Sequence, residues 1–243
     1  MCDRPKANYL LNAVPTEQYA HLLANLEPVT LALGQCLHEP GHDLSYVYFP
    51  IDCIVSLLHV MNNSTSAEIA VVGYEGVVGV SSFMGDRITH NRAVIQNAGT
   101  AYRLKASVMQ AAFDECGPLQ KGLLCYTQAL IAQMSQTAAC NRHHTLEQQL
   151  CRWVLLTIDR MRSDEMKMTE ELVANMLGIR LGSISEITEK LQFARLITYT
   201  DGRIAVLNRA GLEILVCECY GVVEAEYERL LSGIRLRPTL VSI

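Results

Sequence analysis

The sequence has no apolar run of the roughly 18 residues that a membrane-spanning helix needs, and its first ten residues contain no signal-peptide core. It also lacks the basic excess that many nucleic-acid-binding proteins carry, since 20 Lys and Arg stand against 25 Asp and Glu. Because neither a membrane-spanning run nor a signal-peptide core is found, we expect a cytoplasmic protein with no membrane partner. Its 243 residues, half of them hydrophobic, are enough for two folded domains.

Closely spaced cysteines are also scarce. Most of the nine stand singly within apolar segments, as Cys53 and Cys151 do, which is typical of buried thiols in a reducing compartment. Only Cys217 and Cys219 are near each other, and on the helix expected there a C-x-C spacing directs them to different faces. We therefore expect no metal site.

The histidines do not form a recognisable metal or catalytic motif. His38, His42 and His59 lie in a β-prone region, but the H-x-H pair of a cupin-type metal enzyme is missing. We interpret His143 and His144 as a solvated link between two helices. The pattern does not favour an enzyme, and it leaves the cofactor unknown.

A different pattern runs from Met168 to Leu207. Thr169 is suited to cap a short helix, and Gly178 suits the tight turn that ends it. The second helix has one apolar face, formed by Ile184, Ile187 and Leu191. Two β-prone runs joined at Asp201-Gly202 then predict a hairpin. Helix, turn, helix and hairpin together predict a winged helix-turn-helix, whose second helix fits the major groove of DNA.

Three stretches in and around this region carry a family resemblance. They are LGIRLGSISEITEKLQFARLI, then LNRAGLE, and NRHHTLEQQLCRWVLLTIDRM further upstream. They resemble the DNA-binding part of the cyclic-AMP receptor and fumarate-nitrate regulator (Crp/Fnr) family of bacterial transcription factors. The resemblance implies a homodimer that binds a near-palindromic site in double-stranded DNA. It further implies a small-molecule effector of unknown identity, and RNA polymerase as a partner.

From Val29 onward, short β-prone runs with Pro and Gly at their joints indicate a β-roll or jelly roll. In the resembled family this is a cyclic-nucleotide-binding-type effector domain. The expected fold class is therefore α+β. It comprises a β-roll over 1–117, a dimerisation helix over 118–143, and a winged helix-turn-helix domain over 144–243 that ends in one helix from Arg209 to Leu231.

The phosphate-binding cassette of that family differs here. Val80 stands where the family has Glu, and Asn91 occupies the Arg position, with Arg92 one residue late. A one-residue slip in a strand sends a side chain to the opposite face, so we expect no standard binding of cyclic AMP. The residues assigned to the effector pocket are Gly79, Val80, Ser81, Asn91, Arg92 and Tyr126.

A long helix is predicted from Leu119 to about Arg142, after Gly117-Pro118 breaks the chain. Apolar residues repeat along it at intervals of seven, which favours a helix that packs on a second copy of the chain. The residues assigned to this dimer interface are Leu123, Leu124, Ile131, Met134 and Ala138.

The predicted DNA-reading helix departs from the family as well. Leu181 and Gly182 replace the usual Arg and Glu, and Ser183 to Glu186 matches a capping box that predicts a late helix start. The alternative is therefore a ligand sensor or scaffold that has lost specific DNA binding. The residues assigned to DNA contact are Arg180, Leu181, Ser183, Ser185, Glu186, Lys190, Thr200 and Arg203.

Overall fold

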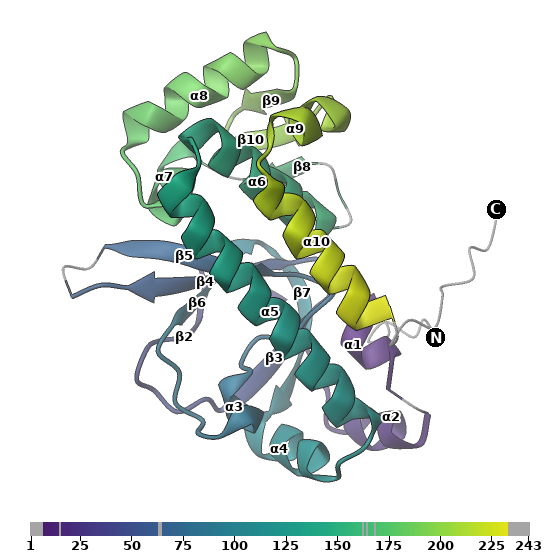
Figure 1. Cartoon of the computed structure of the whole chain (residues 1–243). Helices are drawn as coiled ribbons and strands as arrows, with labels where there is room; N and C mark the ends of the chain where they lie inside the picture. The colour runs from purple at the N-terminus through teal and green to yellow at the C-terminus, as the bar shows by residue number, and fades with distance from the viewer. Residues whose placement is uncertain are drawn as a thin grey trace.

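The computed structural model describes residues 7–14, 16–62, 65–161, 163, 165–167 and 169–232. A β-rich half, a long helix and a second helical half with its own small sheet follow one another along the chain (Figure 1). The α+β fold predicted from the sequence is confirmed. Within the described residues, no helix combines the length and the apolar character needed to cross a bilayer.

The N-terminal half is a β-roll of two antiparallel sheets. Two short helices, α1 (Tyr9–Asn12) and α2 (Thr16–Leu23), precede it. One sheet has the order β1-β7-β3 and the other β2-β6-β4-β5. The strands are β1 (Glu27–Leu31), β2 (Cys36–His38), β3 (Tyr46–Pro50), β4 (Ile54–Val60), β5 (Ser66–Val72), β6 (Arg92–Asn97) and β7 (Gly99–Lys105).

Apolar side chains from both sheets form the core of the roll. Phe49 and Leu104 come from one sheet and Ile54 and Ile95 from the other, and all four are completely buried. Two helices, α3 (Ser81–Met84) and α4 (Ala106–Asp114), lie toward one end of the roll (Figure 1). Nothing in the sequence pattern had predicted α4.

Helix α5 (Pro118–His143) connects the two halves. It begins where predicted, because Pro118 occupies the first helical turn, in which its missing N–H leaves no bond unmade. Its buried side chains pack on the roll. Thr145 then caps α6 (Leu146–Asp159) through a capping box with Gln148.

The C-terminal half contains the predicted helix-turn-helix and hairpin. Its helices are α7 (Glu170–Leu177) and α8 (Leu181–Phe193), and its hairpin strands are β9 (Ile197–Thr200) and β10 (Arg203–Val206). A strand that the sequence did not suggest, β8 (Glu165–Lys167), pairs with β10 and completes a sheet of order β8-β10-β9.

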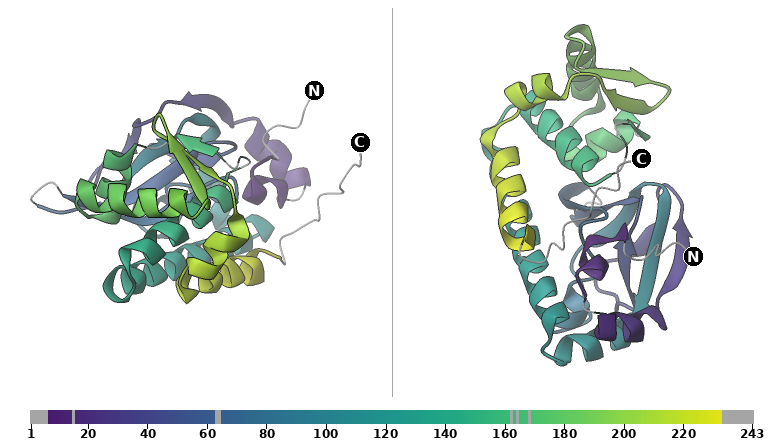
Figure 2. Two further views of the ribbon diagram at one scale, coloured as in Figure 1. Left: turned by 90° about the horizontal axis from the view of Figure 1, so that it is seen from above. Right: turned by 90° about the vertical axis from the view of Figure 1, so that its right-hand side faces the viewer.

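The prediction of a single closing helix over Arg209–Leu231 is wrong. The segment forms α9 (Arg209–Leu215) and α10 (Glu218–Leu231), because Val216 and Cys217 are extended and break the helical hydrogen bonding. Nor does α10 pack on the winged domain alone: it runs back alongside α5 toward the roll (Figures 1 and 2). The Tyr227 hydroxyl donates a hydrogen bond of 2.9 Å to Gln133 Oε1 on α5.

Buried polar groups connect the roll to the C-terminal half. On β4, the Ser56 hydroxyl lies 2.6 Å from Glu68 Oε2 and 3.6 Å from the sulfur of Met176 on α7. Burial raises the pKa of Glu68 to about 7. Ser56 Oγ also lies 2.7 Å from Gln96 Oε1, and its single proton serves only one acceptor at a time. A protonated Glu68 completes this network by donating to Ser56.

Candidate nucleic-acid interface and sensor pocket

The helix-turn-helix is built from local capping and one left-handed turn. Thr169 accepts a hydrogen bond from the Leu172 amide and starts α7, and Gly178 ends it with φ 68°. The expected late start of α8 at Ser183 is wrong. The helix begins at Leu181, since Arg180 is its N-cap residue and the Ser183 amide already bonds the Arg180 carbonyl at 3.1 Å.

One face of α8 is open to solvent at the outer end of the molecule (Figure 1). Arg180, Leu181 and Glu186 are exposed there, and Ser183 is half-buried beside them. Arg180 has no ion-pair partner among the described residues, so its guanidinium is available to a guanine edge or a phosphate. The opposite face is fixed to the domain by the buried Ile184 and Leu191.

Three of the predicted DNA-contact residues are bound within the chain. Ser185 donates a hydrogen bond to Glu170 of α7, which fixes the two helices to each other. Lys190 Nζ lies 2.7 Å from Glu147 of α6. Arg203 Nη1 lies 2.9 Å from Glu165 of β8. The two cations remain largely exposed, whereas the hydroxyl of the half-buried Ser185 is hydrogen-bonded within the domain, and its contact with DNA stays a prediction.

The hairpin has the predicted geometry. Asp201 and Gly202 both have positive φ, 52° and 67°, as a two-residue hairpin turn requires. Thr200 is exposed at the turn. The hairpin therefore presents Thr200 and the exposed part of Arg203 at its tip, as a wing would.

The charge of this surface is mixed. From Gly178 to Arg209 the chain has five basic and three acidic residues, whereas from Ser163 to the end nine basic residues face twelve acidic ones. Glu186 and Glu189 lie exposed on α8 itself. Attraction to phosphates is therefore modest for one subunit.

The predicted effector pocket is a small cavity between the roll and α5. Its volume of about 20 Å³ is room for about one water molecule. Of the predicted residues, Gly79, Val80 and Asn91 line it. Asn91 Oδ1 lies 3.1 Å from His38 Nε2, and burial lowers the pKa of that imidazole.

Three residues assigned to the effector pocket do not line this cavity. Arg92 is not part of the cavity lining, and its Nε donates a hydrogen bond of 2.7 Å to Glu39 Oε2. This is expected because consecutive residues of extended chain, such as Asn91 and Arg92, direct their side chains to opposite faces. Tyr126 packs against Gly76 and the edge of the Tyr227 ring instead. Ser81 begins α3 and is also absent from the lining.

The exposed side of α5 carries three of the predicted dimer residues. Leu124 and Ile131 are 44% and 56% exposed, and Ala138, seven residues further on, is exposed as well. Leu123 was assigned to the same surface, but it is completely buried in the core of its own chain. Met134 lines the small cavity. The assignment of Leu123 is corrected: a helix turns by about 100° per residue, so the adjacent Leu123 and Leu124 face different partners. Met134 is half-buried, and its place in a dimer interface stays a prediction.

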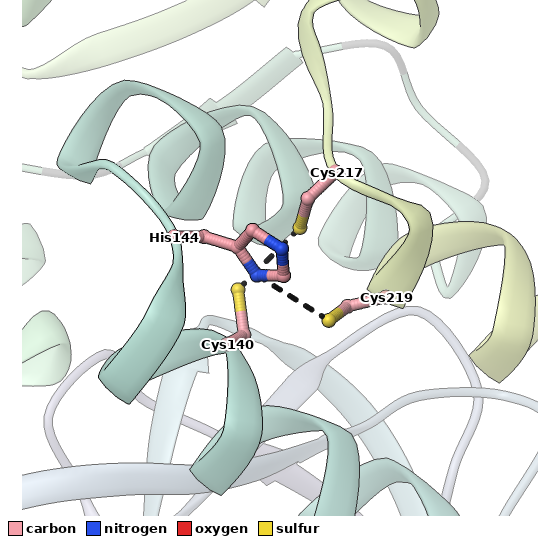
Figure 3. A group of neighbouring side chains, drawn as sticks. All are labelled: Cys140, His144, Cys217 and Cys219. Atoms are coloured by element: carbon pink, nitrogen blue, oxygen red, sulfur yellow. Dashed lines mark hydrogen bonds between the residues drawn. The ribbon is translucent and has the colours of Figure 1, made fainter.

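The expectation that Cys217 and Cys219 face apart is also wrong. Cys217 precedes the first turn of α10, and the two thiols converge with Cys140 and His144 from the end of α5 (Figure 3). The donor atoms of these four side chains all lie within 4.8 Å of one another. Sequence reasoning considered the cysteine pair alone, because 77 residues separate Cys140 from Cys217.

Sequence reasoning also missed a cleft of about 260 Å³ between the two halves. Its walls include Glu75 of the roll, Arg160 at the end of α6, and Glu224 and Tyr227 of α10. Arg160 lies 3.3 Å from Glu75 and 3.2 Å from Glu224. No local pattern marks these residues, because the fold alone brings them together.

Comparison with known proteins agrees with this geometry. Residues 148–215 match the family model of the Crp-like helix-turn-helix domain. No curated protein matches the chain significantly by sequence. The chain carries a Crp-like helix-turn-helix domain, and the predicted resemblance to Crp/Fnr regulators is confirmed.

Solved structures are similar over most of the chain. A Crp/Fnr-family protein from Eubacterium rectale is 15% identical, with a TM-score of 0.67, covering 86% of this chain and 98% of that one. FixK2 from Bradyrhizobium japonicum is 15% identical with a TM-score of 0.66, covering 79% and 98%. CLP, a c-di-GMP-responsive global regulator from Xanthomonas campestris, is 11% identical with a TM-score of 0.62, covering 79% and 99%.

Proposed function

We propose that this chain, a Crp-like regulator by its fold and its helix-turn-helix domain, acts in the cytoplasm as a homodimer that binds a near-palindromic DNA site. The observation that carries the proposal is the open face of α8, where Arg180, Leu181 and Glu186 reach solvent beside the wing. A helix with one buried face and one solvent-exposed face is suited to the major groove of DNA.

The open face suggests which base edges are read. Arg180 can donate two hydrogen bonds to a guanine, Glu186 can accept one from a cytosine amino group, and Leu181 can contact a thymine methyl group. Arg203 and Lys190 keep exposed cationic groups and serve as phosphate contacts. This set differs from the Arg and Glu of the family pattern, so the operator should differ too.

The exposed side of α5 supports the proposed dimer. Leu124, Ile131 and Ala138 repeat at seven residues, the spacing at which one helix packs along a parallel copy. Two copies related by a two-fold axis would present two α8 helices to successive half-sites. Two DNA-binding domains also make twice as many phosphate contacts, which compensates for the modest positive charge of one domain.

The β-roll is proposed as a sensor that does not bind cyclic AMP in the standard way. Val80 and Asn91 line a cavity that holds about one water molecule, and Arg92 is engaged by Glu39. Neither the ribose acceptor nor the phosphate-binding arginine is therefore in place. The effector of the roll is unidentified, and RNA polymerase is a further partner of the proposed regulator.

DNA binding is tested by selection of fragments from genomic DNA with the full-length protein, followed by fluorescence anisotropy on the enriched site. We expect a two-fold symmetric site whose affinity falls steeply with salt. Arg180→Ala should weaken specific binding by about 1–3 kcal/mol. Arg87→Ala is the matched control, because Arg87 is an exposed arginine of the roll that pairs only with Asp43 among the described residues.

The opposite result is equally informative. If no fragment is enriched over competitor DNA, with the dimer intact and with small molecules from a cell extract added, the proposal fails. The chain is then better described as a ligand sensor or scaffold of the same fold. The exposed Glu186 and Glu189 on α8 are the observation that favours this second candidate.

A further inference from the structure

Four potential metal ligands meet where α5 ends and α10 begins (Figure 3). Cys140 is in the last turn of α5, and His144 is the residue that caps that helix. Cys217 is the N-cap residue of α10, and Cys219 is in its first turn. The sequence pattern is C-x-x-x-H followed, after a long interval, by C-x-C.

The spacing of the donor atoms fits one tetrahedral ion. Ligands about 2.3 Å from a zinc ion at tetrahedral angles lie about 3.8 Å from each other. The Cys140 and Cys217 sulfurs are 3.5 Å apart, the Cys219 sulfur is 3.6 Å from His144 Nδ1, and no pair in the set exceeds 4.8 Å. The Cys140 and Cys217 sulfurs are also well beyond the S–S bond length of about 2.05 Å.

A carboxylate orients the imidazole. Glu218 Oε1 lies 3.3 Å from His144 Nε2, whereas the other ring nitrogen, Nδ1, lies 3.6 Å from the Cys219 sulfur. Histidines that bind metals almost always donate their second N–H to such a partner, which fixes the tautomer. Here that tautomer leaves Nδ1 free to bind a cation.

A buried cation lies near the cluster. Arg152 is only 3% exposed, and its Nε has no hydrogen-bond partner among the described residues. Its Nη1 donates a hydrogen bond of 3.2 Å to the hydroxyl of Thr137, three residues before Cys140 on α5. Three thiolates, a neutral imidazole and Zn²⁺ carry one net negative charge, which the buried guanidinium would balance.

We propose that Cys140, His144, Cys217 and Cys219 bind one Zn²⁺ ion per chain. Binding releases the three thiol protons and forms three Zn–S bonds and one Zn–N bond. Because the protein supplies all four ligands, the ion is structural. It fastens the first turn of α10 to the end of α5, at the point where the chain passes from the sensor half to the DNA-binding half.

The test is metal analysis of the full-length protein, purified in reducing buffer without chelator. We expect about one zinc per chain. After chelation, Co²⁺ should restore the site and give the absorption of a tetrahedral thiolate complex. Cys219→Ala should lose the metal, whereas Cys36→Ser, which changes an exposed cysteine of the roll, should retain it.

A second variant keeps the test decisive if Cys219→Ala fails to fold. His144→Cys converts the set to four thiolates and should still hold zinc. The proposal is overturned if the reduced wild-type chain takes up neither Zn²⁺ nor Co²⁺, or if the anaerobically isolated protein contains a Cys140–Cys217 disulfide in place of the metal. These measurements do not involve DNA, so their outcome does not depend on whether the proposed regulatory function is correct.

Discussion

The guanidinium of Arg160 lies 3.3 Å from the carboxylate of Glu75, and this contact joins the end of α6 to the β-roll. The same guanidinium reaches Glu224 on α10 and lies 4.6 Å from the centre of the Tyr227 ring. Arg160 and Glu75 are both almost fully buried. The buried guanidinium of Arg160 therefore links the β-roll, the end of α6 and α10.

Replacement of Arg160 by Met should destabilise the protein strongly. Removal of one partner of a buried ion pair leaves an uncompensated charge and typically costs about 3–5 kcal/mol. Urea unfolding monitored by fluorescence measures the change. Arg87→Met is the control, because the exposed Arg87–Asp43 pair should contribute at most about 1 kcal/mol. Equal effects of the two substitutions would show that the buried network is not stabilising.

Glu68 should make stability depend on pH. Its folded pKa of about 7 exceeds the ordinary value of 4.5, so between these pH values the folded state binds more protons than the unfolded state. Stability should therefore fall as the pH rises from 4.5 to 7, by at most about 3 kcal/mol. The slope should then level off above pH 7.

Glu68→Gln should remove this slope and unfold at higher urea concentration than wild type at pH 8, with little difference at pH 4.5. The exposed Glu115, changed to Gln, serves as the control and should leave the slope as it is. A wild-type slope that persists in Glu68→Gln would assign the pH dependence to other groups.

The two glycines of the helix-turn-helix should respond in opposite ways to alanine. At Gly182 an added Cβ meets nothing within 4 Å, so Gly182→Ala should stabilise α8 by about 0.5–1 kcal/mol. Gly178 has φ 68°, so Gly178→Ala should destabilise by about 1–2 kcal/mol. Thermal unfolding compares both. If Gly182→Ala is stable yet binds the selected DNA site less tightly, the added methyl group must lie against the DNA.

Ile131→Glu should convert the dimer to a monomer. It places a charge on the most exposed large apolar side chain of α5 without disturbing the core of its own chain. Size-exclusion chromatography with light scattering gives the mass. Ile214→Glu is the control, since Ile214 is even more exposed but lies on α9. A wild-type chain that is monomeric at all concentrations would contradict the proposed assembly.

Local chemistry made part of the molecule predictable. The Thr169 cap, the left-handed Gly178 and the Asp201-Gly202 turn each fix a few neighbouring residues, and together they specify the helix-turn-helix and its wing. The exposed apolar repeat of α5 is similarly local. Leu123 was assigned to it wrongly, because two adjacent leucines give no indication of which one faces the core.

The sequence pattern could not predict contacts between residues that are far apart in the chain. Cys140 and Cys217 meet only because α10 turns back along α5, and that turn depends on the extended residues before Glu218. Likewise, the contacts of Arg160 with Glu75 and Glu224 join segments far apart in the chain. No spacing rule contains such information, since the tertiary fold creates it.

The return of α10 also has a consequence for biosynthesis. Tyr227 hydrogen-bonds Gln133, which lies 94 residues earlier, and its ring covers Tyr126 against the roll. In a growing polypeptide α10 is made after the β-roll and α5, so these elements leave the ribosome with one side of α5 still uncovered. The packing of α5 is therefore complete only once α10 has been synthesised, and a chain cut short before α10 would expose this side of α5 to chaperones and proteases.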